Sequence, residues 1–133
     1  MAEVKSDALG FEGFEARQEE RLGFERDATL WGGFVPADFA FDFDVPRAPA
    51  WLTPLTAAFL HADLLHLAFN LLILVWCGRP TEAVIGTAGF AILYVVGAYA
   101  AAGAHYLVDP SETIPMIGAS GAVSAVLGAY ALL

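Results

Sequence analysis

Three long apolar segments fill most of the second half of the chain and limit its possible folds more than any other feature. They cover approximately residues 55–78, 84–108 and 116–133. Each is close to the roughly 20 helical residues that cross a hydrocarbon core about 30 Å thick. Arg79–Glu82 and Asp109–Glu112, which both contain proline, separate them. The pattern predicts an all-α, polytopic membrane protein with three transmembrane helices, whose neighbours run antiparallel because the breaks are short.

Composition supports lipid as the solvent for much of the chain. Of the 133 residues, 58% are hydrophobic and 16% are charged, with a mean hydropathy of +0.61. The formal net charge of -9 makes nucleic acid an improbable partner. Arg79 is the only Lys or Arg after Arg47, which predicts a cytoplasmic first loop and an external second loop. The helix ends next to the second loop would then face the outside of the cell (inner) membrane.

Residues 1–50 differ from the rest because most of the acidic side chains lie there. A Gly-Phe-Glu triplet occurs at 10–12, 13–15 and 23–25, and residues 31–49 are rich in Phe, Pro and Asp. We expect a largely irregular region, with a solvated or partly helical tail over the triplets, that ends in a loop at the headgroup level, where aromatic rings are favoured. Residues 51–133 form the expected membrane domain.

Four polar side chains stand out in the first apolar segment: His61, Asp63, His66 and Asn70. Polar groups at membrane depth are costly and usually face a bundle interior or a wet cavity. His66 and Asn70 are four residues apart, so on a helix they point at one spot, whereas His61 and His66 would diverge by about 140°. That divergence argues against a metal site built from these residues and His105, so no metal or cofactor is expected. If these polar side chains do not form a functional site, they instead form hydrogen bonds between helices.

Small residues dominate the second and third apolar segments, where they let helix backbones approach closely. In the third segment, Ser120, Ser124 and Gly128 fall at four-residue steps, and Gly118 and Gly121 flank the first serine. Ser120 is therefore either part of a packing stripe or a reactive group.

Three motifs together resemble the rhomboid family of intramembrane serine proteases, over about Trp51–Leu133. They are HADLLHLAFN at 61–70, GRPTE at 78–82 and GASG at 118–121. The resemblance implies that Ser120 is the nucleophile and that the His66 and Asn70 side chains and the Ser120 N–H stabilise the oxyanion. Peptide hydrolysis needs both kinds of group. The supporting residues it implies are His61, Gly118, Gly121, Gly78 and Glu82.

The resemblance also implies parts of a rhomboid domain that these residues lack. Members use a Ser-His dyad whose base lies on a later helix, and His61, His66 and His105 do not occupy that position. Residues 1–30 contain no long apolar run that matches the family's first helix. We therefore expect a partial domain without the base histidine, inactive alone.

The implied function is endopeptidase cleavage in or near transmembrane segments of membrane proteins. The partners would be those segments and the lipid bilayer. The alternative is a proteolytically inert rhomboid-like protein that binds transmembrane helices without cutting them.

Overall fold

The computed structural model describes residues 2–40 and 47–133, and within these ranges the protein is helical. The elements are α1 (Ala2–Gly32), α2 (Ala37–Ala40), η1 (Ala50–Leu52), α3 (Thr53–Ala57), α4 (Leu64–Val108) and α5 (Ser120–Tyr130). Over the described ranges the only β-type pairing is an isolated bridge between Phe34 and Met116. The all-α expectation is confirmed.

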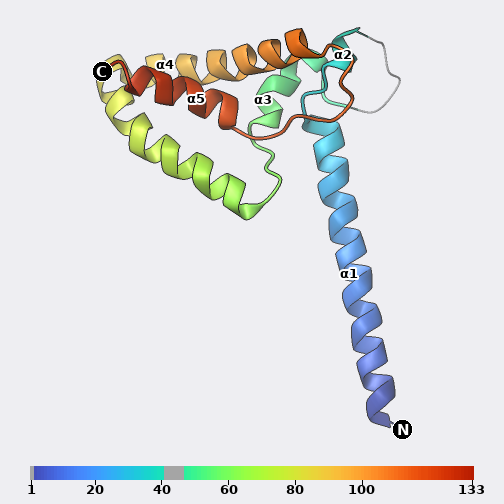
Figure 1. Ribbon diagram of the computed structural model, residues 1–133. Helices are drawn as coiled ribbons and strands as arrows, with labels where there is room; N and C mark the ends of the chain where they lie inside the picture. The colour runs from blue at the N-terminus through green and yellow to red at the C-terminus, as the bar shows by residue number, and fades with distance from the viewer. Residues whose placement is uncertain (1, 41–46) are drawn as a thin grey trace.

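Helix α4 consists of two arms that fold back on each other. It runs through 45 residues, but Gly86 has φ 76 and ψ 163, which ends the first arm (64–85) and starts the second (87–108). Figure 1 shows the two arms as a hairpin, with α5 lying between them in this view. The hairpin confirms that the first two apolar segments run antiparallel.

The break between the first two segments does not lie at the predicted Arg79–Glu82. The helix continues through Pro80 and past Glu82, and it breaks at Gly86. Gly86 adopts a backbone conformation that is essentially restricted to glycine, because any Cβ would collide with the backbone there. Across this break, the Thr87 hydroxyl donates a hydrogen bond of 2.8 Å to Glu82.

The structure does not confirm the three predicted transmembrane spans. The first helix begins at Leu64 rather than near residue 55, because residues 53–57 form the separate helix α3. Helix α5 has 11 residues, or about 16 Å at 1.5 Å per residue, too short to cross a hydrocarbon core. Among the described residues, α4 is the one helix that is long and apolar enough to cross a membrane.

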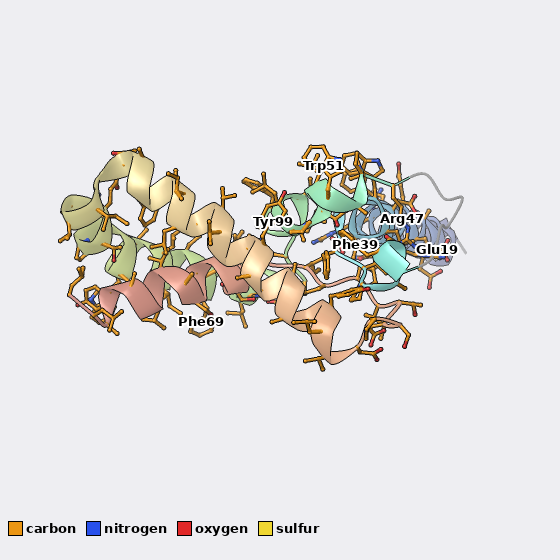
Figure 2. The ribbon with its side chains drawn as sticks, turned by 90° about the horizontal axis from the view of Figure 1, so that it is seen from above. Glu19, Phe39, Arg47, Trp51, Phe69 and Tyr99 are labelled. Atoms are coloured by element: carbon orange, nitrogen blue, oxygen red, sulfur yellow. The ribbon has the colours of Figure 1, made fainter. Side chains whose placement is uncertain are left out.

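The N-terminal region also differs from the expectation of a largely irregular chain. Helix α1 occupies 31 residues, and an exposed Arg21–Glu25 ion pair of 2.8 Å joins two of its successive turns. Figure 1 shows α1 leaving the bundle crosswise to the arms of α4, and Figure 2 shows it end-on. Residues 41–46 of the expected aromatic loop lie outside the described residues.

Helix α5 packs against the second arm of α4 through small residues. A Cβ added at Gly97 would lie 2.5 Å from the Ala125 Cβ and 3.2 Å from the Ala122 Cα, and one added at Gly121 would overlap the Ala101 Cβ. The neighbouring Val126 is completely buried. The two helices are therefore as close as their backbones permit, which fixes the start of α5.

Loops close the end of the bundle opposite the Gly86 turn. Phe34 and Met116 exchange backbone hydrogen bonds of 3.0 and 2.8 Å, and Phe34 packs with Ala57 and Ala102 in the local core. The Tyr99 hydroxyl donates to the Trp51 carbonyl at 2.8 Å, and Figure 2 shows these two residues side by side. These contacts hold residues 34–40 and 47–57 over the end of the bundle where α5 begins.

Candidate functional site

The first wall of the site is the start of α4. Asp63 caps the helix, since its side chain accepts the His66 backbone N–H at 2.7 Å. His66 lies in the first turn and Asn70 one turn later, as the sequence predicted, and Asn70 is only 7% exposed. A capped helix end thus presents both side chains at fixed positions.

His61 lies in the loop before α4, so the helical angle used to separate it from His66 does not apply. The ring centroids of His61 and His66 are 5.2 Å apart, in an edge-to-face arrangement. The predicted divergence of the two rings is wrong, because Asp63 starts the helix only after His61. The structure therefore groups His61 with His66.

The second wall is the segment that leads into α5. Gly118 has φ 113, and its backbone N–H donates to the Ala57 carbonyl at 2.8 Å. A Cβ at this position would lie 2.5 Å from His66 Cε1 and 2.9 Å from His66 Nε2. Both the backbone conformation and the contact require glycine. The residue two before Ser120 thus lies directly against the His66 ring.

Ser120 is the first residue of α5 and is exposed. The close packing of Gly121 on the second arm holds this end of the helix in place. Ser124 and Gly128 are exposed as well, whereas Ala122 and Val123 are buried. The face of α5 that carries Ser120 is therefore exposed in the described structure.

A cavity of about 360 Å³ lies next to the contact between Gly118 and the His66 ring. Its lining is mostly apolar and includes Asn70, His61, Tyr94 and Ala119, the residue before Ser120. The Asn70 Nδ2 and His61 Nε2 atoms are buried and lack a hydrogen-bond partner within the described part of the chain. Leaving such groups unpaired typically costs about 1–3 kcal/mol each. The Asn70 Nδ2 amide is available to donate to an acceptor that enters the cavity.

Two predicted supporting residues lie away from this group. Gly78 and Glu82 are at the far end of the first arm, where a Cβ at Gly78 would lie 3.1 Å from the Phe90 ring of the second arm. Their contacts are with the hairpin rather than with the site. His105 lies near the end of the second arm, with its ring centroid 6.4 Å from that of Phe34.

The backbone carbonyl of Ala57, which holds Gly118 in place, was not predicted from the sequence. Residue types carry no signal for this group, because any residue supplies a carbonyl. Ala119 was also missed, since an alanine in an apolar segment gives no indication that it lines a cavity.

Comparisons with known proteins match the part of the chain that contains this site. The model of the Rhomboid domain matches residues 48–133. Rhomboid-related protein 3 of Homo sapiens is 36% identical over 84 residues, which are 63% of this chain and 20% of that protein. Rhomboid protease GluP of Bacillus subtilis (strain 168) is 35% identical over 79 residues, 59% of this chain and 15% of that protein.

The chain matches a fifth or less of the length of these relatives, and no solved structure gives a significant match. The domain match covers well over half of the chain and includes every residue of the two walls described above. A Rhomboid domain implies an integral membrane protein. Together, the motifs, the two walls and the domain match show that the chain belongs to the rhomboid family.

Proposed function

We propose that this chain is the nucleophile-bearing part of an intramembrane serine endopeptidase that cuts in or near transmembrane segments of other membrane proteins. The observation that carries the proposal is the contact of Gly118 with the His66 ring. A Cβ added at Gly118 would lie only 2.5 Å from the Cε1 atom of that ring. This contact brings the segment that leads into the serine helix against His66 on α4. The name of the relative Rhomboid protease GluP, 35% identical over 79 residues, supports the same activity.

In this proposal the Ser120 Oγ attacks the scissile carbonyl carbon. Negative charge then develops on the carbonyl oxygen, and hydrogen-bond donors must be in place to receive it. His66, Asn70 and the Ser120 backbone N–H supply them. The Asn70 Nδ2 is already buried and unpaired in the described structure, so it needs no rearrangement of partners. The first N–H groups of a helix have no partner within it, and the helix dipole favours negative charge there.

The serine proton must go to a base. No hydrogen bond to the Ser120 hydroxyl is formed within residues 2–40 and 47–133. A His66 ring that donates to the oxyanion cannot at the same time accept this proton. We infer that none of His61, His66 and His105 serves as this base.

For the membrane, we propose that each arm of α4 crosses the bilayer and that α5 begins a third crossing. Each arm has about 22 residues, or about 33 Å at 1.5 Å per residue. The site would then lie near the outer face of the cell (inner) membrane, at the end opposite Arg79. Its substrates would enter from the lipid.

The test uses the protein produced from its own gene, in membranes. Fluorophosphonate labelling and cleavage of a transmembrane substrate should both be lost in Ser120→Ala and retained in the matched control Ser124→Ala, one turn along the same exposed face. Asn70→Ala should lower cleavage by about 10²–10³-fold, the usual effect of losing one oxyanion donor. A polypeptide of residues 1–133 alone should not turn over substrate.

The alternative is an inert rhomboid-like protein that binds transmembrane helices. It predicts that the whole gene product captures transmembrane peptides with no labelling of Ser120. That result would exclude the protease proposal.

A further inference from the structure

A second and larger cleft, of about 880 Å³, opens beside the candidate site. One wall is the C-terminal third of α1, from Arg21 to Leu30, and the other is the loop from Phe59 to Leu64. Pro115 and Ile117, which precede the serine helix, also line it. The α1 wall lies outside the residues that match the family model, which begin at 48.

The α1 wall is fixed to the bundle at its C-terminal end. The Thr56 hydroxyl donates to the Gly32 carbonyl at 2.7 Å, and the Ala48 N–H donates to the Trp31 carbonyl at 2.8 Å. A Cβ at Gly32 would lie 3.3 Å from Leu60, which shows how close α1 approaches the loop that forms the other wall. The cleft therefore has two walls that are held relative to each other.

The cleft continues into the candidate site. Phe59, His61 and Leu67 line both this cleft and the 360 Å³ cavity that contains Asn70. Ile117 lies next to Gly118, which touches His66. A polypeptide lying in the cleft would thus lead directly to the start of α5.

The chemistry of the cleft suits a peptide with apolar side chains and one carboxylate. Leu22, Phe24 and Phe59 are 61%, 75% and 77% exposed, so large apolar surfaces line the opening. Arg21 is paired with Glu25 at 2.8 Å, whereas Arg26 has no ion pair within the described ranges. A carboxylate on a bound peptide would give Arg26 an ion-pair partner.

We propose that this cleft binds the extramembrane part of the substrate polypeptide that adjoins its transmembrane segment. Its apolar side chains contact Leu22, Phe24 and Phe59, and an acidic residue pairs with Arg26. The proposal rests on the proposed function, and it adds α1 as the element that selects substrates. Because α1 is not part of the family match, this selection is a property of the present chain.

The test is photo-crosslinking in phosphatidylcholine vesicles, with the whole gene product carrying Ser120→Ala so that capture does not depend on cleavage. The probe is a synthetic peptide with a Leu/Ala transmembrane segment and an extramembrane flank containing Phe, Leu and one Glu. p-Benzoylphenylalanine in place of Phe24 should capture the peptide, whereas the same group in place of Gln18, exposed on α1 outside the cleft, should not.

Arg26→Glu should reduce capture several-fold, and a Lys in place of the peptide's Glu should restore it. The matched control Arg17→Glu, outside the cleft on the same helix, should have no effect.

Equal capture at positions 24 and 18, cross-links to lipid alone, or failure of the charge exchange would overturn the proposal. Fluorophosphonate labelling of the protein with Ser120 intact reports separately on the protease function. Loss of labelling would exclude the protease, whereas loss of capture with labelling retained would exclude only the cleft.

Discussion

Gly118 is the residue on which the geometry of the site depends most directly. Its φ of 113 and its contact with the His66 ring both exclude a side chain. Under the proposed function, we expect Gly118→Ala to displace His66 and to lower the rate of substrate cleavage by about 10²-fold or more, as for loss of an oxyanion donor. The control is Gly128→Ala, because a Cβ at Gly128 meets nothing within 4 Å. Equal rates in the two variants would show that His66 is not held by this contact.

Asp109, which follows the end of α4, predicts a pH effect in the loop before α5. Hydrogen bonds from the side chain and backbone of Ser111 lower the pKa of Asp109 below its ordinary 3.8. A carboxylate with a lowered folded-state pKa stabilises the fold above the unfolded value, and this contribution is lost as pH falls through the lowered value. An NMR titration of the carboxyl carbon should therefore show a pKa below 3.8 that rises in Ser111→Ala. An unchanged pKa in this variant would contradict the assigned cause.

At the scale of elements, the close packing of α5 on the second arm holds the serine helix in place. A Cβ at Gly97 would lie 2.5 Å from the Ala125 Cβ, so Gly97→Ala should force the helices apart. Overpacking of this kind typically costs about 1–3 kcal/mol, which can be measured by unfolding in mixed detergent. Gly103→Ala on the same arm is the control, because its Cβ meets nothing within 4 Å. Adding Ala125→Gly should recover the loss, and no recovery would place the cost elsewhere.

At the scale of the whole molecule, the hairpin of α4 predicts a topology. The Gly86 turn and the loop after α4 lie at opposite ends of the arms, so they should face opposite sides of the membrane. Single-cysteine variants Thr87→Cys and Ser111→Cys, each with Cys77→Ser, should react with a membrane-impermeant maleimide from opposite sides, with Ser111→Cys outside. Reaction of both from the same side would exclude the two crossings of α4.

Much of this protein could be predicted from residues close together in the sequence. Apolar segments predicted helices, and four-residue spacing placed His66 and Asn70 on one face, because both depend on the geometry of a single helix. The combination of HADLLHLAFN, GRPTE and GASG indicated the family, which the match over residues 48–133 confirmed.

Tertiary structure decided the rest. The chain turns at Gly86 and not at Pro80, His61 meets His66, and Gly118 closes on the His66 ring while bonding to Ala57. The contact between Gly118 and His66 could not be predicted from neighbouring residues, because the two are 52 positions apart. Neither residue type indicates which residue it will contact. It exists because small residues let α5 approach the second arm and because Asp63 starts α4 just before His66. A helix forms from its own residues, whereas a site forms only where separate elements pack together.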